Sequence, residues 1–235
     1  IERRPNCPGD IDPYTPTYSP PSPKPPERNP DDERYGNDLD EYIRLYNAMC
    51  TQIDANVGRL FDTLDRLGIS DRTMIVFTSD HGDMQGSHGL KNKCLPYEES
   101  AGIPLIMYVP RLPGGRICDG LVSGIELMPT CIDLAGIAPV DEVDGQSVAP
   151  CLRGETAAAC DTVFSERDNW CMIVREGWKL AAERKDNRLD PTLMFHLEED
   201  PFELQNRSKD SDMRDLRNDL LGRLTAWDSD VRGGR

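Results

Sequence analysis

The first pattern along the chain is a long stretch in which apolar residues recur every three or four positions. Its members are Tyr42, Ile43, Tyr46, Met49, Ile53, Val57, Leu60, Phe61, Leu64 and Leu67. This spacing predicts one long amphipathic helix that begins at Leu39 and continues through these residues. Asn37 or Asp38 can cap its start, and Gly68 is suited to end it.

Two short apolar runs follow this predicted helix. The first, Thr73 to Thr78, is rich in β-branched side chains and predicts a strand buried on both faces of a parallel sheet. The second, Ile103 to Val109, ends at Pro110, and a helix is predicted from about Ser123 to Leu134, closed by Gly136. Helices that alternate with buried strands indicate an α/β fold.

The pattern changes after about Gly154 and again differs at the start of the chain. Short alternating stretches at residues 162–165, 171–175, 178–182 and 192–197 predict a small antiparallel sheet. A last amphipathic helix, from about Met213 to Trp227, is expected to pack on that sheet. The ten prolines between Pro5 and Pro30 exclude regular helix and predict an extended segment, either a linker or a loop that wraps a larger body.

Composition and charge narrow the functional classes. Lys and Arg total 27 against 42 Asp and Glu, and the net charge of -15 argues against a nucleic-acid-binding surface. No apolar run approaches the roughly 18 residues of a membrane span, so none is expected here. The hydrophobic fraction of 37% with 19 prolines and 19 glycines indicates either much loop or a fragment. The chain opens at Ile1 without a targeting signal, so its localisation is not readable.

The eight cysteines contain no C-x-x-C pair, which leaves zinc-ribbon and thioredoxin-like functions without support. Disulfides stay open at this point. Cys50 and Cys131 fall on apolar faces of predicted helices, where we expect reduced, buried thiols.

The stretch with the most chemistry, Thr78 to Lys93, begins where the first predicted strand ends. Ligands of open α/β sheets bind beyond the carboxyl ends of strands, so Asp80 and His81 project into the expected site. Asp80 offers oxygen and His81 nitrogen, a pair able to contribute to a divalent cation site that needs further ligands. The alternative is that Asp80 caps the following turn and His81 is an ordinary surface histidine.

A series of motifs continues on both sides of this stretch. They are Y-N-A-M-C-T-Q-I-D-A-N-V-G at 46–58, S-D-H-G-D-M at 79–84, Y-E-E at 97–99, I-P-L-I-M-Y-V-P at 103–110 and F-H-L-E-E-D-P-F-E-L-Q-N at 195–206. In this order they resemble the sulfatases of the alkaline-phosphatase superfamily, which include choline-sulfatase-like and phosphonate monoester hydrolase groups. The resemblance covers nearly everything after residue 35.

The resemblance implies a fold and a division of the chain. The fold would be α/β, an alkaline-phosphatase-like mixed sheet flanked by helices and only partly present here, with a small C-terminal antiparallel sheet plus helix. Residues 1–36 would form a proline-rich extended segment and 37–154 the C-terminal part of the catalytic domain. Residues 155–235 would form an antiparallel-sheet subdomain.

Carried over residue by residue, the resemblance implies roles within the same stretch. Asp80 and His81 match the second pair of metal ligands, with Ca²⁺ as the first choice and Mn²⁺ as the alternative. Lys93 matches the lysine that contacts the sulfate group, and Lys91 is its competitor. His88 would contact the substrate or the residues that bind it, although a purely structural role in the glycine-rich loop is equally open.

The nucleophile implied by the resemblance is absent from these residues. The family uses a formylglycine made from Cys or Ser in a C-x-P-x-R or C-x-A-x-R motif, and none of the eight cysteines stands in that context. We therefore expect the formylglycine upstream, in a missing N-terminal half, and we expect residues 1–235 to be inactive alone. His196 stands where the family commonly has Asp, and we interpret it as structural.

The function implied is metal-dependent hydrolysis of sulfate esters, with a small-molecule or glycan sulfate ester as substrate. A phosphonate or phosphodiester hydrolase on the same scaffold is the second reading, because both anions are tetrahedral and similar in size. A non-catalytic fragment is the third, because the nucleophile segment is lacking. The leaving alcohol is not readable from the sequence.

Overall fold

The computed structural model describes residues 4–7, 39–138, 143–156, 160–186 and 188–233. They form two compact units, Ile1–Pro110 with Phe202–Leu204, and Arg111–Pro201 with Gln205–Arg235. This division follows contacts between residues, with a boundary after Pro110, and the domain boundary at 154 that the change of sequence pattern indicates stays a prediction. The predicted extended segment and the two possible capping residues, Asn37 and Asp38, lie almost wholly outside the described residues. None of the described helices is long and apolar enough to cross a membrane.

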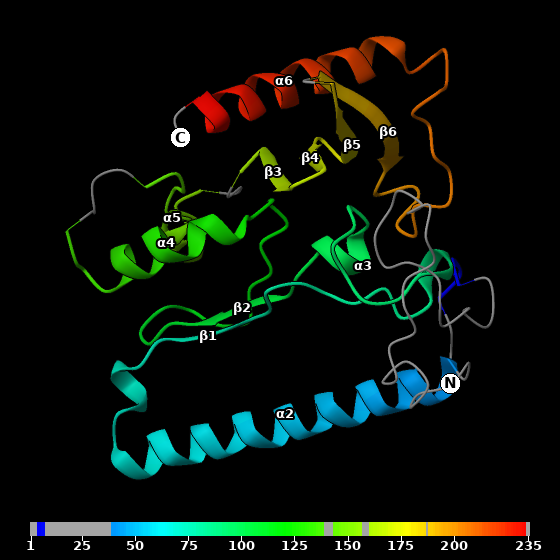
Figure 1. Ribbon diagram of the computed structural model, residues 1–235. Coiled ribbons are helices and arrows are strands. Elements are labelled where there is room, and N and C mark those ends of the chain that lie inside the picture. Colours follow the sequence, from blue (N-terminus) through cyan, green and yellow to red (C-terminus); the bar gives the residue numbers. More distant parts are fainter. Residues whose placement is uncertain (1–3, 8–38, 139–142, 157–159, 187, 234–235) are drawn as a thin grey trace. The chain divides into compact units, whose positions relative to one another are not determined.

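The first unit contains the long helix α2, Leu39–Leu67, whose start and end agree with the predicted ones (Figure 1). Gly68 adopts a φ of 64°, the left-handed conformation that ends a helix. Leu39 and Ile43 are buried, whereas Met49, Ile53 and Leu60 are more than half exposed. The expectation that Cys50 is buried is therefore wrong, because the described residues leave much of this apolar face uncovered.

The two predicted strands of the first unit pair with each other. β1, Ile75–Thr78, lies antiparallel to β2, Leu105–Tyr108, and Ile75 stands opposite Tyr108 (Figure 1). The expected parallel sheet is thus not found among the described residues, and Phe77 and Tyr108 are exposed. An apolar run indicates that both faces of a strand are buried in the folded protein, but it carries no information on the direction of the neighbouring strand.

Short helices complete the first unit. η1, Ser70–Arg72, joins α2 to β1, η2, Ser87–Gly89, lies in the loop after β1, and α3, Glu98–Ala101, precedes β2. The sequence analysis did not identify these elements, because three or four residues show no periodicity.

The second unit contains the predicted antiparallel sheet. Its strands are β3, Thr162–Arg167, β4, Trp170–Arg175, β5, Trp178–Lys185, and β6, Arg188–His196, in the order β3-β4-β5-β6. Neighbouring strands follow one another directly in the sequence, which is the arrangement that alternating stretches and charged turns predict.

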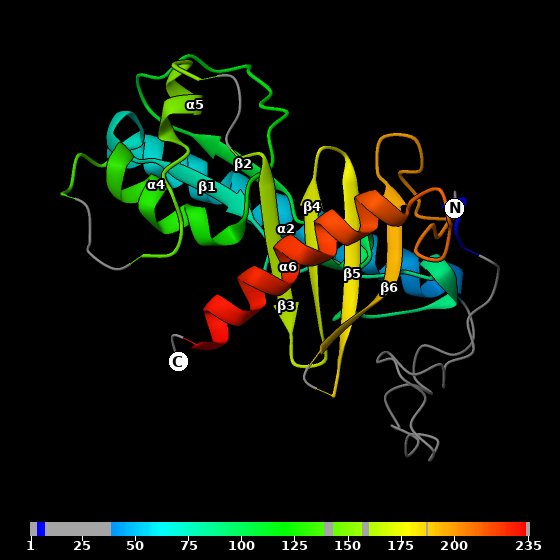
Figure 2. The same ribbon diagram turned by 90° about the horizontal axis from the view of Figure 1, so that it is seen from above.

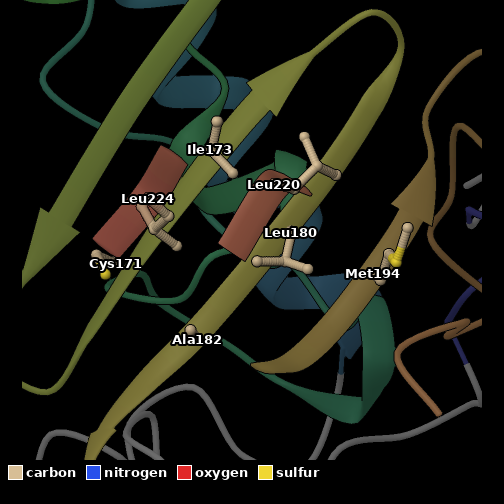
Figure 3. Packing of buried hydrophobic residues seen from close by; sticks show 7 residues of the cluster. All are labelled: Cys171, Ile173, Leu180, Ala182, Met194, Leu220 and Leu224. Atoms are coloured by element: carbon tan, nitrogen blue, oxygen red, sulfur yellow. The ribbon is translucent and has the colours of Figure 1, made fainter. Parts of the chain in front are cut away.

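The helix α6, Arg214–Gly233, packs across one face of this sheet (Figure 2). Alternate residues of β4 and β5 meet helix residues four positions apart in a buried cluster (Figure 3), whose members are Cys171, Ile173, Leu180, Ala182, Met194, Leu220 and Leu224. Farther along α6, Arg184 of β5 bonds Asp228 at 2.5 Å and the Phe164 and Trp227 rings stack at 4.9 Å. The predicted packing of the last helix on the sheet is confirmed.

The other helices of the second unit lie before the sheet in the sequence. Ser123 and Glu126 form a capping box that starts η3, Gly124–Glu126, and α4 continues over Leu127–Leu134. This confirms the helix expected over residues 123–134. A further short helix, α5, Ala149–Arg153, was not anticipated.

Candidate functional site

Asp80 and His81 follow β1 directly and lie beside each other. The Asp80 Oδ2 and His81 Nε2 atoms are 3.3 Å apart. Two ligands at right angles to each other, each about 2.2–2.4 Å from one cation, would be about 3.1–3.4 Å apart. Asp80 is 83% exposed in its side chain and His81 41%, so both groups are open to a cation. Their spacing therefore fits two neighbouring ligands of one metal ion.

Hydrogen bonds around these two residues set their chemical form. The His81 backbone amide donates to Asp80 Oδ1 at 2.9 Å, and this bond lowers the pKa of the Asp80 carboxyl. His81 Nδ1 lies 2.9 Å from the Gly82 carbonyl oxygen, which can only accept, so Nδ1 carries the hydrogen. In the neutral ring the lone pair then resides on Nε2, the atom beside the Asp80 carboxylate. A histidine that binds a metal ion through Nε2 needs this tautomer.

Gly82 fixes the backbone immediately after the ligand pair. Its amide donates to the Ser100 carbonyl oxygen at 2.9 Å, and a Cβ at this position would overlap the Glu99 carbonyl oxygen. Only glycine allows the loop to approach α3 so closely.

Two further contacts hold the loop that follows. Met84 N donates to Asn92 O at 2.7 Å, which brings the chain at Lys93 back beside Asp83. Asp83 in turn accepts a hydrogen bond of 2.8 Å from the Tyr42 hydroxyl of α2. Burial, together with this carboxylate, raises the pKa of Tyr42, which stays a neutral donor.

The structure does not separate the two candidate lysines. Lys91 and Lys93 are both half-buried, and both follow the turn of the same loop. Each lysine comes directly after a carbonyl that accepts a backbone hydrogen bond, Lys91 after Leu90 O, which pairs with Gly86 N, and Lys93 after Asn92 O, which pairs with Met84 N. The assignment of sulfate contact to Lys93 stays a prediction.

His88 lies in a buried network with residues far away in the sequence. Its backbone amide donates to Asn6 O at 2.8 Å, and its Nε2 lies 3.1 Å from Asn6 Nδ2. Its ring stacks on Tyr97 with 4.0 Å between centroids. Asn6 also donates to Glu99 Oε1 at 2.6 Å and to Phe202 O at 3.1 Å. This placement favours a structural role for His88 over contact with substrate.

Among the described residues, one further group could hold a metal ion: His88, Glu99 and Glu203, whose ligand atoms lie within 4.8 Å of one another. Asn6 Nδ2, however, is within hydrogen-bonding distance of both His88 Nε2 and Glu99 Oε1. Its amide hydrogens thus take the place that a cation bridging those two atoms would need. We interpret Asn6, His88 and Glu99 as a latch that holds residues 4–7 to the loop. Sequence reasoning missed it, because Asn6 is 82 and 93 positions away from its two partners.

His196 also takes a structural position, in the second unit. Its Nδ1 accepts a hydrogen bond of 3.2 Å from the Glu199 amide, and its ring meets the Trp178 ring edge-on at 4.7 Å. These contacts agree with the structural interpretation of this histidine.

Comparison with known families gives two matches. Residues 6–137 match the family model described as Sulfatase, and residues 86–230 match the one described as N-sulphoglucosamine sulphohydrolase, C-terminal. The first match covers more than half of the chain, and the two together reach from the residues of the latch to the last helix.

Curated relatives carry sulfatase names. The chain is 38% identical over 172 residues to the choline-sulfatase of Rhizobium meliloti (strain 1021), covering 69% of this chain and 32% of that protein. It is 32% identical over 175 residues to arylsulfatase K of Xenopus laevis, covering 68% of this chain and again 32% of the relative. The chain thus spans about a third of the length of these relatives.

Solved structures share the fold. A protein solved in complex with its substrate D-glucosamine-2-N,6-O-disulfate superposes with a TM-score of 0.74 at 26% identity, covering 83% of this chain and 42% of that one. The phosphonate monoester hydrolase of Agrobacterium radiobacter gives a TM-score of 0.72 at 27% identity, covering 85% and 43%. The expected alkaline-phosphatase-like α/β fold is thereby confirmed.

Proposed function

This chain belongs to the sulfatase family, and we propose that the whole protein hydrolyses sulfate esters with the help of a divalent cation. The observation that carries the proposal is the position of Asp80 Oδ2 and His81 Nε2, 3.3 Å apart at the exposed end of β1. Their spacing, their exposure and the tautomer of His81 all suit metal binding.

The candidate residues have separate roles in the proposed reaction. Asp80 and His81 hold the cation, and two hydrogen bonds keep their side chains oriented, one between His81 Nδ1 and Gly82 O and one from the His81 amide to Asp80 Oδ1. Lys93 places a compact ammonium against the transferring group and neutralises its charge. When bound, the cation polarises a sulfate oxygen and lowers the pKa of the attacking group. A formylglycine outside these residues supplies that group.

Calcium is the cation that we propose. Carboxylate oxygen suits calcium, and calcium is usual in the family that the motifs resemble. A histidine nitrogen in the ligand pair makes manganese the alternative, because imidazole suits softer ions. Elemental analysis of the purified full-length protein distinguishes them directly.

The proposed substrate is a small or glycan-derived sulfate ester. The relatives include a choline-sulfatase and arylsulfatases, and one similar structure holds a disulfated glucosamine. The net charge of -15 would repel extended sulfated polymers except near the cationic centre, which favours small or locally bound esters.

The second candidate is hydrolysis of phosphonate monoesters, which the similarity to the Agrobacterium radiobacter enzyme favours. The test is a side-by-side assay of the full-length protein with chromogenic sulfate and phosphonate monoesters of the same leaving group. A higher kcat/KM for the sulfate ester, lost on chelation, is expected. Preference for the phosphonate would replace the first candidate, and turnover of neither ester would contradict both.

A further inference from the structure

Cys118 and Cys151 of the second unit lie in contact, although 33 positions separate them in the sequence. Their Sγ atoms are 3.0 Å apart. Bonded sulfur atoms are about 2.05 Å apart, so closing the gap needs a movement of about 1 Å. We propose that these two thiols are a site of oxidative modification, at which a low-molecular-weight disulfide such as oxidised glutathione converts them into a protein disulfide.

Contacts on both sides of Cys118 hold the two sulfur atoms together. A Cβ at Gly154 would overlap the Arg116 guanidinium group, which shows that this side chain lies against the end of α5. Leu121 is held by a β-bridge in which Cys160 N donates to Leu121 O at 3.1 Å. Cys151 itself is buried within α5. The backbone is thus anchored after the exposed thiol, at Leu121, an Arg116 side-chain contact lies before it, and side-chain rotation can supply the remaining movement.

The exposure of the two thiols sets the order of the reaction. Cys118 is exposed and Cys151 is buried, so an incoming disulfide meets Cys118 first. Cys151 donates its S–H hydrogen to Cys118 Sγ, and this bond is the main cause that raises the pKa of Cys151. Cys118 is therefore the attacking thiol, and Cys151 is the resolving thiol.

The two steps balance as an ordinary thiol–disulfide exchange. The Cys118 thiolate attacks one sulfur of oxidised glutathione, which forms a mixed disulfide and releases one glutathione thiolate. Cys151 gives up its proton to that thiolate and attacks the Cys118 sulfur, which releases the second glutathione thiolate. That thiolate takes the proton that Cys118 lost to solvent. The protein thiols lose two electrons and two protons, and oxidised glutathione gains both as two molecules of reduced glutathione.

Two neighbouring cysteines provide internal comparisons. Cys160 donates to Glu126 Oε1 at 3.0 Å, and burial followed by this carboxylate raises its pKa to about 12. Its thiol is thereby held in the unreactive protonated form. Cys131 is half-buried on α4, between the two proposed partners in the sequence. Neither is expected to enter the disulfide.

The positions of the protease cleavage sites allow the proposed disulfide to be located by peptide mapping. No Lys or Arg occurs from residue 117 to 152, so trypsin leaves 117–153 as one piece with three cysteines. Cleavage after Glu126 and Glu142 then separates Cys118, Cys131 and Cys151 into the pieces 117–126, 127–142 and 143–153. The full-length protein is treated with oxidised glutathione, its remaining thiols are blocked, and it is digested without reductant.

The expected result is that pieces 117–126 and 143–153 are joined, with a mass about 2 Da below the sum of the two, and separate on reduction. Cys118→Ser should abolish the joined species, and Cys50→Ser, which removes another exposed thiol, should preserve it. Oxidation should also raise the apparent Tm by roughly 5–10 °C, because the closed loop restrains the unfolded chain.

Two results would overturn the proposal. One is a wild-type protein in which Cys118 carries glutathione but the two pieces stay separate. The other is a cross-link that involves piece 127–142 in place of either partner. Both are read from the wild-type map, so the test decides even if Cys118→Ser does not fold. The proposal is independent of the proposed hydrolase activity.

Discussion

Replacing Gly82 with alanine should damage the proposed metal-binding loop without touching either proposed metal ligand. The added Cβ would overlap the Glu99 carbonyl oxygen, so the backbone at residue 82 must move. That movement breaks the 2.9 Å hydrogen bond from Gly82 N to Ser100 O and disturbs the carbonyl that orients His81 Nδ1. The change therefore acts on both the fold and the ligand geometry.

The magnitude follows from these contacts. Leaving a buried backbone group unsatisfied costs about 1–3 kcal/mol, and relieving the overlap by strain adds about 1 kcal/mol more. We expect Gly82→Ala to lower the free energy of unfolding by about 2–4 kcal/mol. A misplaced His81 should also weaken metal affinity by about 10- to 100-fold, the range seen when supporting groups of metal ligands are lost.

The matched control is Gly58→Ala in α2, where a new Cβ would meet nothing within 4 Å. Alanine is the better helix former, so this variant should be about 0.5–1 kcal/mol more stable than the wild type. Both variants are measured in the full-length protein by urea unfolding and by titration with calcium. If Gly82→Ala matches the wild type in both measurements, the described contact between the loop and α3 is wrong.

Three further predictions use direct substitutions. Asp80→Ala and His81→Ala should each lower metal content sharply, by elemental analysis, while leaving the circular dichroism spectrum unchanged; full occupancy in both would refute the ligand pair. Lys93→Ala should lower kcat/KM by about 100-fold, about 3 kcal/mol of transition-state stabilisation, and Lys91→Ala should change it little; the opposite ranking in steady-state kinetics would exchange the two lysines. Leu220→Ala should lower the free energy of unfolding by about 3 kcal/mol, because its side chain is 1% exposed in the cluster that α6 forms with the sheet, and a loss below 1 kcal/mol would contradict the described core.

Periodic elements were predictable from the sequence because their signal is repeated many times. The 29 residues of α2 carry ten apolar positions at helical spacing and a closing Gly68, so both ends were found. The end of α6 was placed too early, at Trp227, because the last turns up to Gly233 are polar. The direction of β2 beside β1 could not be read, because a four-residue apolar strand looks the same in either orientation.

The candidate site likewise contains residues that the sequence could identify and residues that it could not. Asp80 and His81 could be proposed as ligands from the sequence because they follow a recognisable strand within one motif, and their role stays a prediction. The latch of Asn6, His88 and Glu99 was not found, because its members come from three distant segments and a lone Asn carries no pattern. Burial of Cys50 was wrongly expected, since periodicity identifies an apolar face but not what covers it.

The proposed metal-binding loop, residues 80–84, combines an anchored backbone with exposed candidate ligand atoms. Gly82 bonds Ser100, Met84 bonds Asn92, and Asp83 accepts from Tyr42, so three successive residues after the ligand pair are held by different segments. Asp80 Oδ2 and His81 Nε2 nevertheless stay exposed. Calcium takes about six to eight ligands, so this pair would supply only part of a coordination shell. The pair would contribute to calcium affinity mainly because its side chains are already held in position before the ion binds. The anchors therefore contribute to metal affinity alongside the ligands, which is why Gly82, a residue with no metal-binding side chain, is expected to control it.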